Sequence, residues 1–263
     1  MQTGAGGAND ARSRRAVTDA DLLYARLPDF QLRVERSLAL VKRSLMRGGI
    51  IAVSFSGGKD STVLLDLVRR VQSDAPAVWF DSGAELDSTR DLCARYGIIV
   101  IHPALTVIEV WKRMGYGGHP RTDPDASLNL QRILIDEPAE RAMRQLGAEI
   151  SAIGLRAEES PARQKSARYH GPLFRTISGW VRLCPLLDWK YADIWAYIAS
   201  RNLAYNSAYD DMAAMGIERK YQRISTLLDG KAATVGRYVY LKRCEPALFN
   251  RLAAEFPKIR AYA

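Results

Sequence analysis

The chain has 263 residues and a formal net charge of +9, with 48% hydrophobic and 25% charged residues. This composition is typical of a soluble globular protein with one sizeable domain and an appendage. It contains no apolar run of roughly 18 residues, so we expect no membrane span. The excess of basic residues favours anionic partners such as nucleotides, sulfate or nucleic acid. Because the arginines are scattered along the sequence, their positions do not indicate which of these partners binds.

Two features bear on the compartment of the protein. Residues 1–18 are rich in Gly, Ala, Asn and Arg and lack the apolar centre of a signal peptide, so we expect a disordered tail. Cys93, Cys184 and Cys244 lie far apart and form no Cys-x-x-Cys pair, which argues against a zinc ribbon, a disulfide framework and an iron–sulfur cluster. We therefore expect a reduced, cytoplasmic protein without an iron–sulfur cluster.

Residues 30–154 alternate between predicted helices and short apolar strands. Apolar residues at helical spacing predict helices, and short continuous apolar runs predict buried parallel strands. In chain order these are a helix at 30–47, a strand at 50–53, a helix after residue 61, a strand at 77–80, a helix at 88–96, a strand at 98–101, a helix at 137–146, a strand at 150–154 and, further on, a helix at 192–203.

This alternation predicts an α/β fold, namely a doubly wound parallel five-stranded sheet with helices on both faces and a mainly helical C-terminal extension. The expected division is a tail at 1–18, a main domain at 19–210 and an extension at 211–263. Ligands of such sheets bind at the carboxyl ends of the strands. The loops that begin at Ser54, Asp81 and Gly154 are therefore expected to face one crevice.

The most informative segment lies between the first strand and its helix and reads Ser54-Phe55-Ser56-Gly57-Gly58-Lys59-Asp60-Ser61. Two adjacent glycines let backbone N–H groups converge without a Cβ in the way, and the helix N-terminus adds a partial positive charge. Serine hydroxyls and the ammonium of Lys59 add further donors. The segment predicts a phosphate-binding loop rather than a plain turn, and its spacing is neither that of a Walker loop nor that of a dinucleotide fingerprint.

This loop resembles the Ser-Gly-Gly-x-Asp-Ser PP-loop of the ATP pyrophosphatase superfamily. Three further segments resemble elements of the PAPS (phosphoadenosine phosphosulfate) reductase and ATP sulfurylase small-subunit family, in the family's order. They are the segment at 79–85, the Gly-x-Arg-x-x-Glu-Ser-x-x-Arg segment at 154–163, and the Pro-Leu-x-x-Trp to Asp-Ile-Trp segment at 184–195. The resemblance spans residues 30–209 and implies the adenine nucleotide alpha hydrolase-like fold of the HUP type.

The resemblance also implies roles for individual residues. The nucleotide is expected to contact Ser54, Phe55, Ser56, Gly57, Gly58, Lys59, Asp60, Ser61, Asp81, Ser82, Gly83, Gly154 and Arg156. Lys59, Asp60, Arg156 and Arg163 are expected to act in catalysis, with the two arginines forking onto sulfate or phosphate oxygens. Asp60 is an expected Mg²⁺ ligand. The plainer alternatives are a helix cap for Asp60, a turn residue for Asp81 and surface salt bridges for the arginines.

The reaction depends on whether a nucleophilic thiolate is present. PAPS reductases provide one late in the chain within a Glu-Cys-Gly-x-His motif, and this chain has only Cys244 in a Lys-Arg-Cys-Glu-Pro setting. The flanking cations would lower the pKa of Cys244, which keeps a thiol mechanism open. Without that motif, we expect an ATP pyrophosphatase or adenylyltransferase that cleaves ATP between the α- and β-phosphates, transfers AMP to an unknown acceptor and releases pyrophosphate.

Two alternatives stay open beside this expectation. One is thiol-dependent reduction of PAPS or of APS (adenosine 5'-phosphosulfate), and the other is a non-catalytic nucleotide-binding component of a nucleic-acid sulfur-modification system. The expected small molecules are therefore ATP, or PAPS or APS in its place, and Mg²⁺. A nucleic acid or protein partner on the basic surface and a homo-oligomer are also expected.

Overall fold

The computed structural model describes residues 16–113, 129–224 and 237–263. Within these ranges one sheet has the strand order β3-β2-β1-β4-β6-β5. The strands are β1 (Ile50–Ser54), β2 (Ala77–Phe80), β3 (Ile99–Ile101), β4 (Ala148–Ala152), β5 (Leu173–Arg175) and β6 (Val181–Leu183). Five neighbouring strands run parallel, and β5 pairs antiparallel with β6 at one edge. The sheet therefore has six strands where five were expected, because a three-residue edge strand leaves too short a pattern to recognise.

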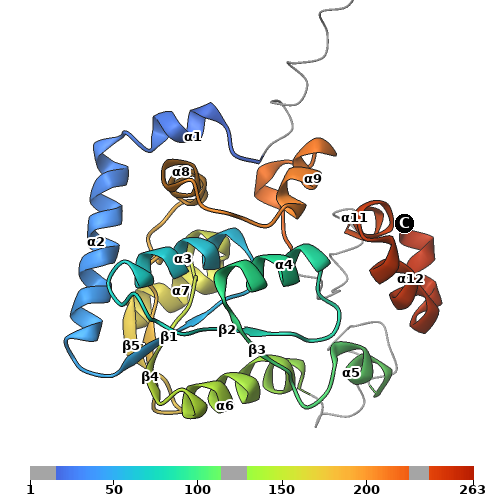
Figure 1. Cartoon of the computed structure of the whole chain (residues 1–263), viewed down its shortest axis with the longest axis horizontal. Coiled ribbons are helices and arrows are strands. Elements are labelled where there is room, and N and C mark those ends of the chain that lie inside the picture. The colour runs from blue at the N-terminus through green and yellow to red at the C-terminus, as the bar shows by residue number, and fades with distance from the viewer. Residues whose placement is uncertain (1–15, 114–128, 225–236) are drawn as a thin grey trace, which may run out of the picture.

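Helices cover both faces of the sheet (Figure 1). They are α1 (Asp19–Tyr24), α2 (Pro28–Leu45), α3 (Lys59–Arg69), α4 (Asp87–Tyr96), α5 (Val107–Arg113), α6 (Glu137–Gln145), α7 (Pro161–His170), α8 (Tyr191–Arg201), α9 (Ala208–Ala214), α11 (Arg237–Cys244) and α12 (Pro246–Glu255). In Figure 1, α3 and α4 lie on one side of the strands and α6 on the other. Since side chains alternate along a strand, Ile51 and Val53 join the large core, whereas Ala52 packs with Met143 of α6. The predicted α/β architecture is confirmed.

The predicted bounds agree with the structure within two residues, except that α3 begins at Lys59, three residues before its predicted start. Recognisable residues set several of these bounds. Pro28 occupies the first turn of α2, where a missing N–H costs nothing. Helix α4 ends at Gly97 with φ +63°, and α8 ends at Asn202 with φ +48°, both in the left-handed conformation that closes a helix. Residues 173–183, which showed no clear pattern in the sequence, form the β5–β6 hairpin.

Two predictions about the ends of the main domain need correction or stay open. Ala16 is buried and its N–H donates to the carboxylate of Asp210 at 2.7 Å, so the expected disordered tail is wrong for residues 16–18. Residues 1–15 of that tail lie outside the described residues. The division after residue 210 stays a prediction, and helix α9 runs across it.

None of the described helices combines the length and the apolar character that crossing a membrane requires.

Candidate functional site

The loop between β1 and α3 adopts a conformation that its glycines make accessible. Gly57 has φ +71°, and a Cβ built on it would lie 2.7 Å from Cγ2 of Thr89. A side chain at this position would therefore be strained and would clash with α4. Gly58 caps α3 in an extended conformation. The sequence argument that bare backbone is needed here applies most strongly to Gly57.

Serine side chains tie the loop together from within. The N–H of Ser56 donates to Oγ of Ser61 at 3.1 Å, and that hydroxyl donates to the carbonyl of Gly58 at 2.9 Å. Ser54 ends β1. Phe55 turns into the core, where its ring lies 5.9 Å from that of Tyr96. Ser56 and Ser61 thus shape the loop, and Phe55 is mainly a packing residue.

A compact charge cluster lies at the start of α3. Oδ2 of Asp60 accepts a hydrogen bond from Nζ of Lys59 at 2.9 Å, and Oδ1 accepts one from Nε of Arg156 at 2.5 Å. Lys59 is 2% exposed and Arg156 is 3% exposed. Arg156 also donates to Glu158 at 2.5 Å. The structure therefore brings together three of the four predicted catalytic residues.

The electrostatics of this cluster keep Asp60 and Arg156 charged. Burial opposes ionisation of Asp60, but the attraction of Lys59 and Arg156 outweighs it and lowers the pKa of Asp60 below its ordinary value. Burial likewise opposes the charge on Arg156, and Asp60 outweighs it and raises the pKa of Arg156. At neutral pH two buried cations therefore share one carboxylate beside the loop.

The end of β4 positions Arg156 against the loop. A Cβ on Gly154 would lie 3.2 Å from the backbone carbon of Asp60, so glycine allows the two segments to approach closely. The N–H of Ala157 donates to the carbonyl of Leu187 at 2.9 Å. The turn after β6 thereby fixes the backbone that carries Arg156.

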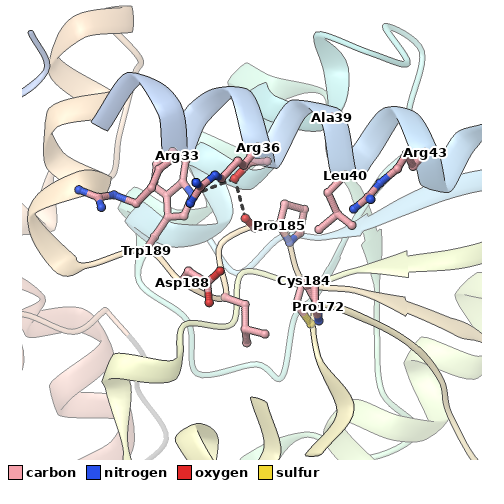
Figure 2. Close-up of a pocket in the computed structure, with 12 residues that line it drawn as sticks. Arg33, Arg36, Ala39, Leu40, Arg43, Pro172, Cys184, Pro185, Asp188 and Trp189 are labelled. Carbon is pink, nitrogen blue, oxygen red and sulfur yellow. Dashed lines mark hydrogen bonds between the residues drawn. The ribbon is translucent and has the colours of Figure 1, made fainter. Parts of the chain in front are cut away.

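Helix α2 holds the turn after β6 in position through hydrogen bonds (Figure 2). Oγ of the buried Ser37 donates to the carbonyl of Pro185 at 2.7 Å and accepts from Nε1 of Trp189 at 2.8 Å. Figure 2 shows both bonds as dashed lines, with Pro185 and Trp189 lying beneath α2. A cavity of about 380 Å³ lies between α2 and this turn, and Arg36 is among the residues that line it. None of its lining residues belongs to the phosphate loop.

Arg163 does not join the cluster. It lies on α7, whose residues are all exposed or half-exposed, and its side chain is 45% exposed. Its guanidinium pairs with Glu159 one turn earlier. The structure therefore gives Arg163 the surface salt bridge named as its plainer alternative, and an anion-binding role for it stays a prediction.

The loop after β2 lies beside the phosphate loop and is tightly held. Asp81 is buried, pairs with Arg90 and accepts from the N–H of Gly83 at 2.9 Å. Ser82 donates to Glu85 at 2.6 Å. Gly83 has φ +89°, and its carbonyl accepts a hydrogen bond from Arg251 of α12 at 2.7 Å. The C-terminal extension therefore contacts the predicted nucleotide site.

A cavity of about 160 Å³ opens where the two loops meet. Its walls are mostly apolar with a few polar groups, a mixture typical of small-molecule sites. The lining residues are Phe55, Ser56, Trp79, Phe80, Ser82, Glu85, Leu134, Ile135 and Ile224. Burial raises the pKa of Glu85, and the Ser82 hydroxyl opposes that shift. Six of these lining residues were not predicted as site residues, namely Trp79, Phe80, Glu85, Leu134, Ile135 and Ile224. The first three lie in the family-like segment at 79–85, whereas no local pattern marks the other three.

The arrangement does not fit the Mg²⁺ expected on Asp60. This ion prefers oxygen ligands that are free to coordinate it, and both oxygens of Asp60 already bind cationic side chains. Asp81 is likewise engaged by Arg90. Across residues 16–113, 129–224 and 237–263, no group of three His, Cys, Asp or Glu residues is suited to a metal ion.

Comparison with known proteins decides the family. A model of the "Phosphoadenosine phosphosulfate reductase domain" matches residues 50–238, which is more than half of the chain. The chain belongs to this family. The match begins at β1, and it contains the phosphate loop, Arg156 and the turn after β6.

Named relatives of this PAPS reductase family member agree. The chain is 33% identical over 169 residues to adenosine 5'-phosphosulfate reductase of Anoxybacillus flavithermus, covering 61% of this chain and 67% of the relative. It is 29% identical over 218 residues to the enzyme of the same name from Oceanobacillus iheyensis, covering 76% and 82%. A solved PAPS reductase from Candida auris, in a phosphate complex, superposes with a TM-score of 0.50 at 19% identity over 72% of this chain and 87% of that one. At this identity the structural likeness shows the fold alone.

The cysteines of this family member do not provide an activated thiolate in the structure. Burial raises the pKa of Cys93 to about 12 and that of Cys184 to about 11. Burial, reinforced by Asp211, raises the pKa of the half-buried Cys244, and Arg243 offsets only part of the shift. The expectation that flanking cations lower the pKa of Cys244 is therefore wrong, because burial and a nearby carboxylate outweigh them.

Proposed function

We propose that the chain binds an adenosine 5'-phosphosulfate-type nucleotide, either APS or PAPS, and supports its thiol-dependent reduction. The observation that carries this proposal is the meeting of two buried cations, Lys59 and Arg156, at the N-terminus of α3. Helix N-termini and buried cations favour phosphate and sulfate groups. Family membership and the names of the APS reductases support a sulfonucleotide as the ligand.

The two parts of the site suit the two parts of such a ligand. The cavity beside the loop is lined by Phe55, Trp79 and Phe80 together with polar Ser82 and Glu85, a lining that suits a nucleoside. The loop glycines and the N-terminus of α3 suit its α-phosphate. Lys59 binds one carboxylate oxygen of Asp60 and Arg156 binds the other. The sulfate of the ligand would replace Asp60 as a partner of the Arg156 guanidinium.

In the proposed reaction a thiolate attacks the sulfur of the sulfonucleotide and forms an S-sulfonate. The bond between sulfur and the phosphate oxygen breaks, and AMP, or its 3'-phosphorylated form, leaves with the electron pair. A second thiolate then attacks the sulfur atom of the first thiol, which forms a disulfide and releases sulfite. Lys59 and the α3 amides stabilise the charge that develops on the leaving phosphate.

The two thiols are proposed to come from a separate dithiol donor. This follows from the raised pKa values of Cys93, Cys184 and Cys244, since the thiolate is the attacking form. The same observation favours a second candidate that needs no thiol, in which ATP is cleaved between its α- and β-phosphates and AMP passes to an acceptor. The phosphate loop would then retain the pyrophosphate.

One experiment separates these candidates. The protein is incubated with APS, PAPS or ATP, with and without a dithiol, and sulfite, AMP and pyrophosphate are quantified by chromatography. We expect sulfite from APS or PAPS in the presence of the dithiol, an unchanged rate in Cys244→Ser and loss of the reaction in Arg156→Gln. Pyrophosphate from ATP would favour the second candidate. Tight nucleotide binding without any product would favour the non-catalytic alternative and contradict both reactions.

A further inference from the structure

Tyr209 of helix α9 reaches the phosphate loop from a part of the chain that no motif marks. Its Oη accepts a hydrogen bond from the backbone N–H of Lys59 at 3.2 Å, and Lys59 is the first residue of α3. A Cβ on Gly58 would lie 3.5 Å from the same oxygen. The phenol oxygen therefore lies beside Gly58 and the first amide of α3, at the helix end where an anion is expected.

The hydroxyl of Tyr209 has a proton left to give. The side chain is 2% exposed. Its hydroxyl oxygen accepts a hydrogen bond from the backbone N–H of Lys59, but no described residue accepts a hydrogen bond from the hydroxyl proton. Burial raises the pKa of Tyr209, partly opposed by Lys59, so the phenol stays protonated at neutral pH. A buried donor without an acceptor is costly, and an oxyanion on the loop would supply that acceptor.

We propose that Tyr209 is part of the anion-binding loop and donates its hydroxyl hydrogen bond to a phosphate oxygen of the bound nucleotide. This inference rests on the proposed function, because it assigns a further binding residue to the same site. It also gives helix α9 a role in ligand binding, since its phenol would contact the ligand together with the amides of α3.

The surroundings of the ring hold the phenol in this position. The ring packs edge-on against the buried Trp195, with centroids 5.3 Å apart and planes at 90°. Nζ of Lys59 lies 5.8 Å from the ring centroid, and Asp210, the next residue of α9, accepts a hydrogen bond from the N–H of Ala16. A donor fixed in advance loses little freedom when the anion arrives.

A neighbouring tyrosine provides a matched control. Tyr205 also packs edge-on against Trp195, with centroids 5.6 Å apart, but its hydroxyl donates to Asp210 at 2.7 Å. Tyr205→Phe and Tyr209→Phe therefore remove the same atom from two rings on the same tryptophan. Only Tyr209→Phe removes a hydroxyl that is hydrogen-bonded to the phosphate loop.

The test measures equilibrium binding of pyrophosphate, AMP, APS and adenosine to the full chain and to both variants by calorimetry, with thermal unfolding to verify that each variant folds. A hydrogen bond to a charged group corresponds to roughly a ten- to hundredfold change in Kd. We expect Tyr209→Phe to weaken AMP and pyrophosphate by about that factor and to leave adenosine unchanged. Tyr205→Phe is expected to leave all four ligands unchanged. A merely structural role for Tyr209 would weaken adenosine as well.

Two results would overturn the inference. Unchanged affinity for AMP and pyrophosphate in Tyr209→Phe would show that the hydroxyl does not contact the anion, and tighter binding would show that it only occupies the place of the anion. If the unsubstituted chain binds pyrophosphate but no adenine nucleotide, the proposed function fails, while the pyrophosphate measurements still decide the role of Tyr209. If it binds neither, both proposals fail.

Discussion

Replacing Asp60 with asparagine tests the charge cluster that defines the site. The substitution keeps the size of the side chain and leaves Lys59 and Arg156, both buried, without the carboxylate that they share. Removing one partner of a buried ion pair costs about 3–5 kcal/mol. Arg156 keeps its contact with Glu158 at 2.5 Å, so we expect the free energy of unfolding to fall by about 3 kcal/mol. For a chain of this size that corresponds to a Tm lower by roughly 5–6 °C.

The assay is urea and thermal unfolding at neutral pH, with Asp74→Asn as the control. Asp74 is an exposed residue with no ion pair among the described residues, so its substitution should stay within about 0.5 kcal/mol of the unsubstituted protein. Inorganic phosphate should stabilise Asp60→Asn more than the unsubstituted protein, because an anion can replace the lost carboxylate between the two cations. Equal stability of Asp60→Asn and Asp74→Asn would refute the reasoning.

The same comparison has a defined pH dependence. The pKa of Asp60 is lowered in the folded state, so the unfolded chain binds the proton more tightly. The stabilisation by Asp60 is therefore fully present above its unfolded pKa of about 3.9 and is lost as the pH falls through the lower folded value. The difference between the unsubstituted protein and Asp60→Asn should shrink in acid, and a difference that grows in acid would contradict the assigned pKa direction.

Two further predictions concern the support of the site and its thiols. Ser37→Ala leaves the carbonyl of Pro185 and Nε1 of Trp189 without their hydrogen-bond partner and should lower the unfolding free energy by about 2–3 kcal/mol. The control is Ser44→Ala, which removes only a hydrogen bond within α2. Equal urea midpoints for the two variants would contradict the role of Ser37 in holding the turn. Alkylation of the native protein at pH 8, followed by mass spectrometry, should modify Cys244 first and leave Cys93 and Cys184 unmodified, because burial raises the pKa values of these two thiols to about 12 and 11. Rapid labelling of either buried cysteine would contradict the structure.

The sequence predicted those parts of the site that depend on local chemistry. Gly57 could be recognised because a positive φ and a close neighbour require glycine there. Arg156 could be recognised because it follows a strand end within a family motif. Tyr209 and Ile224 could not be recognised, since their place over the loop depends on how the chain returns after α8, and a single tyrosine or isoleucine carries no spacing signal.

The fold shows the same limit. The strands and helices whose bounds were predicted agree with the structure within three residues, because their periodicity reports burial directly. No bounds were predicted for helices α7 and α12. The β5–β6 hairpin was missed because each strand has three residues. The direction of the pKa shift of Cys244 was also missed, since its sequence neighbours are cationic whereas Asp211 approaches it only in the folded chain.

The central claim is that the bend between β1 and α3 binds the phosphate of an adenine nucleotide. Calorimetric titration of APS and ATP into the unsubstituted chain, Gly57→Ala and Gly97→Ala tests it most directly. Both glycines have a positive φ, but a Cβ on Gly57 meets Thr89 at 2.7 Å, and a Cβ on Gly97 meets nothing within 4 Å. We predict that the unsubstituted chain and Gly97→Ala bind nucleotide and that Gly57→Ala binds it at least roughly tenfold more weakly. Absence of binding to the unsubstituted chain, or equal affinity in all three proteins, would contradict the claim.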